Sequence, residues 1–400
     1  MQRKPPHVLI AGAGIGGLTA ALALLKRGFD VDVYEQAAEL KEVGAGLQIS
    51  ANGNRVLHEL GVLEQLMTLA CETAGKEIRL WNTGQTWKLF DLGAVSAERY
   101  GFPYLTVYRP DLLEVLAQAV RREKPDAIHL NRRCTGFAQR GNRVTLTLEN
   151  ASEAAGEALI GADGVHSRIR QALFGEDQPK FTGIMAWRGT VPMARLPAHM
   201  ARMVATNWVG AGAHVVHYPL HKGKLMNFVG VVERDDWRVE SWTARGTAEE
   251  CAGDFEGWHE DVHQMISNSP TLFKWALLGR EPMDRWTAGN VGLLGDACHP
   301  TLPFLAQGAV MAIEDGFILA RCFEKFRGEV ATALARYERA RRERTTKMVL
   351  GSNENTTRFH NPKLADRAGA QEYVDREWSE ARIGERYEWL FTYDATAVEI

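Results

Sequence analysis

The sequence predicts an α/β fold in which a parallel sheet is interrupted by an inserted antiparallel sheet. Residues 7–35 read as a strand, a glycine-rich turn, a helix and a second strand. Residues 181–233 alternate apolar and polar positions between polar turns, which is typical of antiparallel strands. Residues 291–294 are a short apolar run that we expect to return to the parallel sheet. We therefore predict a discontinuous first domain (1–180 and 281–350), an inserted domain (181–280) and a C-terminal helical segment (351–400).

The glycine-rich turn is the strongest local signal. Gly12, Gly14 and Gly17 fit the pattern G-x-G-x-x-G between an apolar strand and a helix, which is the context this motif requires. The first glycine allows a tight turn, the second leaves room for a pyrophosphate, and the third lets the helix lie close to the strand. Glu35 ends the second strand, where its carboxylate can accept hydrogen bonds from ribose hydroxyls. This order predicts a Rossmann-like nucleotide site and leaves FAD and NAD both open.

Composition and charge exclude several classes of function. The chain of 400 residues is 45% hydrophobic and 24% charged, as in an ordinary globular α/β protein. Its formal net charge of -3 argues against nucleic acid as the main partner. No segment approaches the ~20 apolar residues of a membrane span, and no signal peptide precedes the first strand, so we expect a cytoplasmic protein without a membrane partner. The five cysteines are scattered without a C-x-x-C pair, which favours reduced thiols.

Three positions in the first domain are further candidates for ligand contact. Gly46 lies in a predicted loop, which is either a flexible surface loop or backbone that approaches a flat ligand. Arg109 precedes Pro110 at the start of a well-patterned helix, where it is either solvated or holds a cofactor phosphate or ribose. Asp163 lies in GADGVHSRIR, residues 161–170, which is either a simple turn or a second approach of backbone to a polyanionic ligand.

The inserted domain contains two candidates for chemistry on a substrate. On the expected strand 213–218, His214 and Tyr218 share one face and His217 points to the other. At ~3.3 Å per residue the first two lie ~13 Å apart, so they can line opposite ends of one pocket. The alternative is a satisfied buried histidine and a packed tyrosine. We expect no metal site from His214, His217 and His221, because strand geometry turns His217 away.

The last third of the chain returns to the first domain. Residues 242–280 read as helices. Asp296 follows the buried strand 291–294, an edge at which carboxylates contact ligands in doubly wound folds. A small-residue helix is expected from Gly308 to Leu319. Residues 328–348 read as a charged helix whose arginines form a solvated face.

Three stretches together resemble the fingerprints of the class A FAD-dependent aromatic hydroxylases. These are GAGIGG with Glu35, the central GADGVHSRIR and the late GLLGDACHP, and the similarity runs over residues 7–345. Within the family, the late segment and the YPL turn are similar to salicylate hydroxylase, 3-hydroxybenzoate 6-hydroxylase and 6-hydroxynicotinate 3-monooxygenase. The resemblance implies a Rossmann-like FAD-binding domain and a substrate-binding domain inserted at 181–280.

The resemblance also implies roles for individual residues. Glu35 would hold the adenosine ribose, and Asp296 would bind the ribityl chain. His214 matches a position that acts on the substrate hydroxyl, and Tyr218 matches a pocket tyrosine, so these two are the catalytic candidates. The implied cofactor residues are Gly12, Gly14, Gly17, Glu35, Gln36, Gly46, Arg109, Asp163, Asp296, Gly308 and Ala309.

The expected pocket wall departs from two members of the family. The chain has Pro303 where the hydroxybenzoate enzyme carries a glutamine, and Phe304 where the hydroxynicotinate enzyme carries a histidine. With Leu302, these residues form an apolar wall, which suits a site that must exclude water. Neither of those two exact substrates is therefore implied.

The expected reaction is hydroxylation of a small hydroxylated aromatic acid, of the salicylate or hydroxybenzoate type, through a flavin C4a-hydroperoxide. NADH or NADPH would reduce FAD, O2 would add to the reduced flavin, and a histidine with a pKa near neutrality would deprotonate the substrate. The nicotinamide would bind transiently, because no second G-x-G-x-x-G occurs. The alternatives are an N-heteroaromatic acid such as 6-hydroxynicotinate, a larger phenol, or a flavin redox protein without ring hydroxylation. We expect a monomer or a homodimer.

Overall fold

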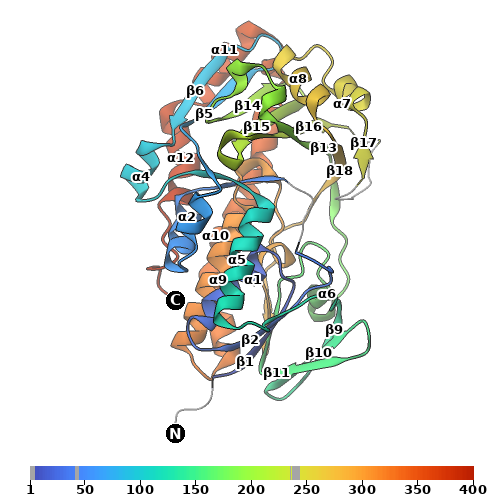
Figure 1. The fold of residues 1–400 in the computed structure, drawn as a ribbon, viewed down its shortest axis with the longest axis vertical. Helices are drawn as coiled ribbons and strands as arrows, with labels where there is room; N and C mark the ends of the chain where they lie inside the picture. The colour runs from blue at the N-terminus through green and yellow to red at the C-terminus, as the bar shows by residue number, and fades with distance from the viewer. Residues whose placement is uncertain (1–4, 41–44, 235, 237–243) are drawn as a thin grey trace.

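The computed structural model describes residues 5–40, 45–234, 236 and 244–400. Figure 1 shows two sheets at opposite ends of the molecule, with helices α9 (Gly308–Lys325) and α10 (Val330–Phe359) running between them. One sheet is mainly parallel and the other is mainly antiparallel. The predicted α/β fold with an additional antiparallel sheet is confirmed.

The first sheet carries the glycine-rich turn. It has six strands in the order β19-β20-β12-β1-β2-β8, and β1 pairs in parallel with both β2 and β12. The predicted return of the chain at 291 is confirmed, because β20 pairs in parallel with β12. The strands are β1 (His7–Ala11), β2 (Asp30–Tyr34), β8 (Ile128–His129), β12 (Ala158–Gly161), β19 (Thr287–Ala288) and β20 (Val291–Leu293).

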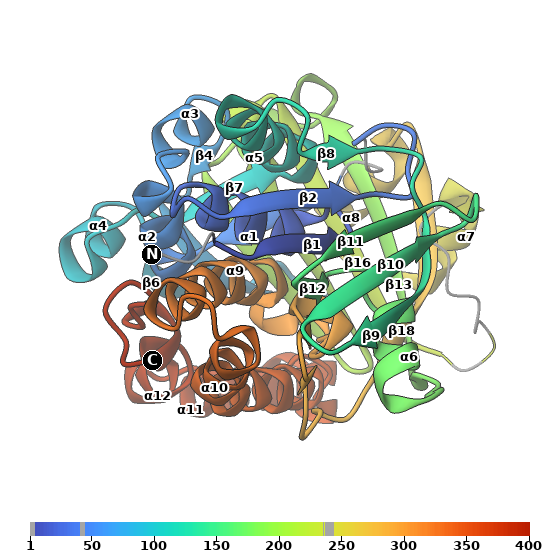
Figure 2. The ribbon, with the colours of Figure 1, turned by 90° about the horizontal axis from the view of Figure 1, so that it is seen from below.

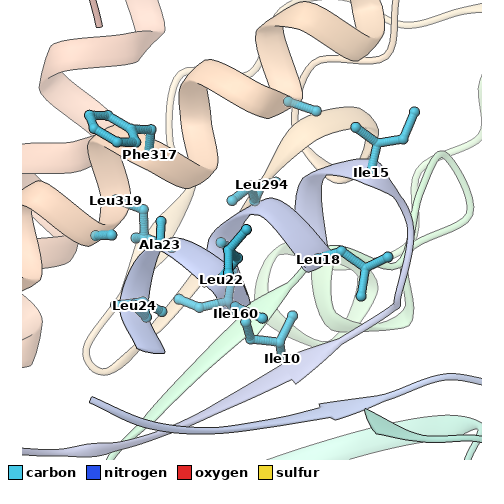
Figure 3. Packing of buried hydrophobic residues seen from close by; sticks show 14 of the residues in the cluster. Ile10, Ile15, Leu18, Leu22, Ala23, Leu24, Ile160, Leu294, Phe317 and Leu319 are labelled. Atoms are coloured by element: carbon cyan, nitrogen blue, oxygen red, sulfur yellow. The ribbon is translucent and has the colours of Figure 1, made fainter. Parts of the chain in front are cut away.

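Helix α1 (Ile15–Leu25) packs on this sheet between α5 (Arg109–Glu123) and α9 (Figure 2). Its alanines and leucines are buried along almost the whole helix, and Figure 3 shows Leu18 and Leu22 beside Ile10 and Ile160 of the sheet. Helix α9 can lie close to α1 because Gly316 has no side chain. A Cβ at this position would lie only 2.7 Å from the backbone nitrogen of Ala20. The sequence of small residues therefore sets the spacing of the layers.

The second sheet has eight strands in the order β17-β18-β13-β16-β15-β14-β5-β6. Two of them, β5 and β6, come from residues 75–91, so the sheet extends beyond the predicted inserted segment 181–280. The strands are β5 (Gly75–Leu80), β6 (Thr86–Asp91), β13 (Lys180–Pro192), β14 (Val204–Gly210), β15 (Ala213–Leu220), β16 (Leu225–Glu233), β17 (Arg245–Gly246) and β18 (Leu272–Gly279).

The prediction that residues 242–280 are helical is wrong for Arg245–Gly246, which forms β17, and for Leu272–Gly279, which forms β18. Residues 242 and 243 lie outside the described residues. The buried positions Leu272 and Ala276 are four residues apart, a spacing that also suits a helix. Pairing with β13, for example Met185 with Ala276, makes the segment a strand, since tertiary contacts override local preference. The described helices of this region are α7 (Ala248–Asp254) and α8 (Glu260–Asn268).

Two small sheets and several helices complete the chain. Gly46 begins β3 and is not in a loop as predicted, because its strand pairs with β7. The small sheets contain β3 (Gly46–Ile49), β4 (Cys71–Glu72), β7 (Leu105–Tyr108), β9 (Cys134–Arg140), β10 (Arg143–Leu148) and β11 (Glu153–Gly156). The helices are α2 (Ala51–Glu59), α3 (Leu63–Met67), α4 (Ala94–Tyr100) and α6 (Arg168–Phe174).

The C-terminal segment is helical, as predicted. Helix α10 continues to Phe359, well past the predicted end at 348, and α11 (Arg367–Glu377) and α12 (Glu380–Phe391) follow. Among the residues described, no helix has both the length and the apolar character needed to cross a membrane.

The expectation that the arginines of α10 form a solvated face is wrong for Arg341 and Arg344. Arg341 is fully buried; it donates a hydrogen bond to Asp315 at 2.6 Å and forms an ion pair with Glu314 at 2.7 Å, both on α9. Arg344 bonds to Glu314 at 2.8 Å. Burial alone would raise the pKa of Asp315, but the charges of His299 and Arg341 outweigh it and lower that pKa. Buried carboxylates on α9 therefore hold these arginines inside.

We expect Arg341→Met to destabilise the protein by about 3–5 kcal/mol, because it leaves two buried carboxylates without this partner. The exposed Arg339 on the same helix is the matched control, and Arg339→Met should change stability by less than about 0.5 kcal/mol. Urea unfolding followed by circular dichroism measures both. Equal stability of the two variants would show that the buried charges do not hold α9 to α10.

Candidate active site

A cavity of about 330 Å³ lies between the glycine-rich turn, the loop after β20 and one face of the eight-stranded sheet. It brings together residues that are far apart in the sequence. Ten of the predicted site residues line it, namely Gly14, Gly46, Arg109, His214, Tyr218, Asp296, Pro303, Phe304, Gly308 and Ala309. The predicted pairing of His214 and Tyr218 along one wall is what the strand geometry produces.

The other predicted residues do not line this cavity. Glu35 accepts hydrogen bonds from the backbone N–H of Ala13 and of Ala37, each at 2.8 Å, so its carboxylate fastens the glycine-rich turn. Gln36 is exposed next to it, and Leu302 is part of the apolar core. These residues border the site from outside the cavity.

Asp163 also forms hydrogen bonds within its own segment of the chain. Its carboxylate accepts hydrogen bonds from the Ser167 hydroxyl at 2.5 Å and from the N–H groups of Arg168 and Ile169 at 2.7 and 3.2 Å. The carboxylate therefore fixes the start of α6, and the neighbouring Gly164 lines the cavity in its place.

The three glycines of the turn meet different surroundings. A Cβ on Gly12 would lie 2.4 Å from the Ala162 carbonyl oxygen, and one on Gly17 would lie 2.0 Å from that of Gly12. A Cβ on Gly14 would meet nothing within 4 Å, so it would enter open space at the start of α1. Ile15 and Gly16, the first residues of α1, also line the cavity, so the N-terminal end of the helix lies beside that space, as a pyrophosphate site requires. The cradle therefore fits the phosphates of the FAD implied by the sequence.

The loop after β20 is held rigidly against the cavity. The carboxylate of Asp315 accepts hydrogen bonds from the Gly295 N–H at 3.2 Å and from His299 Nε2 at 2.6 Å. The side chain of Asp296 opens to the cavity, and burial by the surrounding protein raises its pKa while the charges of His299 and Arg109 oppose the rise. This carboxylate is therefore placed to accept hydrogen bonds from a polyol chain.

The apolar wall is fastened by α10. Ser352 donates a hydrogen bond to the Leu302 carbonyl at 2.6 Å, and Asn355 donates one to that of Phe304 at 3.0 Å. The start of α9 at Gly308 and Ala309 faces the same cavity. Hydrogen bonds from Ser352 and Asn355, which lie 50 and 51 residues later in the chain than the residues they bind, therefore fix the start of the segment 302–309.

His214 lies at one end of the cavity among aromatic rings. It is 1% exposed, and its ring centroid lies 5.1 Å from those of Phe304 and Phe359. Burial lowers the pKa of His214 well below its usual range, and repulsion from His360, when that ring is protonated, acts in the same direction. This direction differs from the expected pKa near neutrality and favours the neutral ring at pH 7.

A buried lysine lines the cavity on the side of Tyr218, because Lys76 pairs with Ala205 of β14 and Ala205 packs with Tyr218. Lys76 is 8% exposed, and its Nζ lies 5.7 Å from the ring centroid of Tyr104, whose hydroxyl donates to Gln48 on β3. The same strand carries Gly46, where a Cβ would lie 2.4 Å from the Tyr218 ring. Burial lowers the pKa of Lys76 to about 8. Burial is the sole cause of this shift, so among the described residues no carboxylate charge offsets it.

Sequence reasoning missed three residues of this site. Lys76 and Arg188 line the cavity, and His360 bonds to His214. Lys76 is on β5, whose pairing with β14 across more than 120 residues has no local signal. His360 lies just after α10, in a segment that we predicted only as a helical tail.

Comparison with known proteins agrees with this architecture. The FAD binding domain family matches residues 6–352. A 3-amino-4-hydroxybenzoate 2-monooxygenase of Streptomyces platensis is 35% identical, over 98% of this chain and 97% of its own. A 6-hydroxynicotinate 3-monooxygenase of Pseudomonas fluorescens is 36% identical, over 88% of this chain and 92% of its own.

A solved structure, Klebsiella pneumoniae HpxO complexed with FAD and uric acid, superposes with a TM-score of 0.80 at 28% identity, over 96% of this chain and 95% of that one. The family match and the relatives extend over nearly the whole chain, and the glycine-rich turn fits the shared cofactor. The chain therefore belongs to the class A FAD-dependent aromatic hydroxylases.

Proposed function

We propose that the chain hydroxylates an aromatic acid whose ring hydroxyl and carboxylate point to opposite ends of the cavity. O2 and NADH or NADPH are the cosubstrates. One observation carries this proposal: His214 and the buried Lys76 line the same cavity from different positions, His214 beside the apolar Phe304 and Lys76 on the side of Tyr218. The substrates in the names of the two relatives, 3-amino-4-hydroxybenzoate and 6-hydroxynicotinate, both carry the hydroxyl para to the carboxylate.

The ammonium end binds the carboxylate. A buried cation without a carboxylate partner is costly, and an anionic ligand removes that cost by supplying the missing charge. Lys76 has this character, and Arg188 adds a second positive charge to the cavity lining. Tyr218 supplies a hydroxyl at the same end, and burial raises its pKa, so it stays protonated and donates a hydrogen bond.

The imidazole end receives the hydroxyl proton. A neutral histidine offers one ring nitrogen as an acceptor, which deprotonates or polarises a phenol and makes the ring richer in electrons. FAD, when bound, supplies the activation of oxygen that the protein itself cannot perform. Pro303 and Phe304 keep water from the side of the cavity that they line.

Three alternative functions place different requirements on the cavity. A salicylate-type acid carries its hydroxyl and carboxylate on neighbouring carbons, so the two groups cannot easily reach both His214 and Lys76. An N-heteroaromatic acid with the para arrangement fits as well as a benzoate. A flavin redox protein without ring hydroxylation would oxidise NADH without forming product. A cytoplasmic location and a monomeric or homodimeric state stay predictions.

We expect 3-amino-4-hydroxybenzoate and 6-hydroxynicotinate to accelerate NADH or NADPH oxidation with formation of a hydroxylated product, and salicylate to do so far less. The measurement combines oxidation of the nicotinamide with product analysis by mass spectrometry. A preference for salicylate would contradict the proposal that the hydroxyl binds at His214 and the carboxylate at Lys76. Oxidation without product from every acid supports the redox protein.

Gly14→Ala should abolish tight FAD binding while the fold keeps its stability. The residue has a φ of -69°, which alanine also adopts, and its Cβ would meet no protein atom within 4 Å. It would instead occupy the space that a pyrophosphate needs. Titration of apoprotein with FAD, followed by flavin fluorescence, measures binding, and thermal melts of the apoproteins measure stability. Gly253→Ala also adds a Cβ into open space and is the control that should bind normally.

Lys76→Met should raise KM for the acid roughly ten- to a hundredfold, the scale of a lost charged hydrogen bond. In the wild type, kcat/KM should fall as the pH rises above about 8, because the ammonium then loses its proton and its attraction for the carboxylate. Lys76→Met should lack this alkaline limb, and Lys76→Arg should move it to higher pH. The exposed Lys88 on β6 is the control. An unchanged limb in Lys76→Met would assign it to another group.

A further inference from the structure

A chain of hydrogen bonds leads from the cavity to the protein surface. Nδ1 of His214 lies 2.6 Å from Nε2 of His360, and Nδ1 of His360 lies 2.8 Å from a carboxylate oxygen of Glu233. The two histidines are buried, whereas the side chain of Glu233 is 52% exposed. The three residues come from β15, from the end of α10 and from the end of β16.

The carboxylate at the outer end fixes the protons along this chain. An ionised carboxylate only accepts hydrogen bonds, so His360 donates its Nδ1–H to Glu233. Nε2 of the neutral His360 is then an acceptor, and His214 must donate its Nδ1–H to it. The remaining nitrogen of His214, Nε2, carries a lone pair and makes no hydrogen bond to another described residue. Because His214 lines the cavity, this lone pair is available to a substrate hydroxyl.

Backbone hydrogen bonds hold the segments that carry His214, His360 and Glu233 in place. The N–H of Gly212 donates to the His360 carbonyl at 3.2 Å, and the N–H of Glu233 donates to that of Gly212 at 2.9 Å. The β14–β15 turn thus ties the end of α10 to the end of β16. The charged or titratable groups that act on the two rings are each other and Glu233, and the other close neighbours of His214 are the uncharged Phe304 and Phe359.

We infer that His360 and Glu233 are positioning residues of a proton relay that sets the tautomer of His214 and carries the substrate proton to the surface. The substrate O–H bond breaks as an Nε2–H bond forms on His214. The Nδ1 proton of His214 moves to Nε2 of His360, and the Nδ1 proton of His360 moves to Glu233 or to water beside it. One proton leaves the cavity, and both rings stay neutral in the opposite tautomer. The reverse transfer returns a proton to the product oxygen and restores the starting tautomers.

This inference rests on the proposed role of His214, so the experiment separates the two. The probe is 4-hydroxy-3-nitrobenzoate, a para acid whose phenolate absorbs visible light, bound to the FAD-loaded protein without NADH or NADPH. A rapid pH jump followed by absorbance gives the rate of phenol ionisation in the site. Flavin fluorescence and thermal melts on the same preparations report cofactor binding and folding.

We expect Glu233→Gln and His360→Asn to slow ionisation of the bound probe roughly 10- to 100-fold, by analogy with the hydrogen-bond partners of metal-binding histidines. FAD binding should not change. Glu233→Gln keeps the hydrogen bond and removes only the charge, so it tests the relay even if His360→Asn folds poorly. Glu233→Asp should restore much of the rate. Glu256→Gln removes an exposed charge elsewhere and should behave as wild type.

Two outcomes would overturn different claims. If His214→Gln slows ionisation of the bound probe but Glu233→Gln and a folded His360→Asn do not, the relay is wrong and the base assignment stands. If His214→Gln itself leaves the ionisation rate unchanged, the base assignment fails and the relay fails with it.

Discussion

Buried charge pairing between α9 and α10 is the constraint on which the site depends. Glu314 and Asp315 are adjacent on α9 and fully buried, so each needs a cationic partner that water cannot replace. Arg341 and Arg344 supply these partners from α10, and Asn52 of α2 donates to Glu314 at 2.7 Å. The same Asp315 carboxylate binds Gly295 and His299. Few arrangements satisfy all these groups together, which we interpret as the reason that the loop beside the cavity has one conformation.

The cavity has separate electrostatic poles because the large sheet is assembled from distant segments. β15 supplies His214 and Tyr218 four residues apart on one face, and β5 adds Lys76 from a part of the chain that precedes β15 by more than 130 residues. The low-dielectric surroundings lower the pKa of both His214 and Lys76. The same burial thus keeps the imidazole neutral, as a base must be, while the lysine remains mostly charged at pH 7.

The C-terminal helices contribute directly to the site. Helix α10 binds the carbonyl groups of Leu302 and Phe304 through Ser352 and Asn355, so it fixes the apolar wall. Its end places His360 against His214. A segment predicted only as a helical tail therefore shapes both the wall of the cavity and the environment of its base.

The sequence by itself determined the nucleotide-binding turn, the three segments that reach the cavity, the family, and His214 and Tyr218 as residues of one wall. These features depend on local patterns, because a glycine cradle and the alternation of a strand are properties of consecutive residues. It could not show that Glu35 and Asp163 fasten their own backbone, that Leu272–Gly279 is a strand, or that Arg341 is buried. Only the tertiary structure decided these points and brought Lys76 and His360 into the site, because a side chain's partner, burial and pKa depend on residues that are distant in sequence.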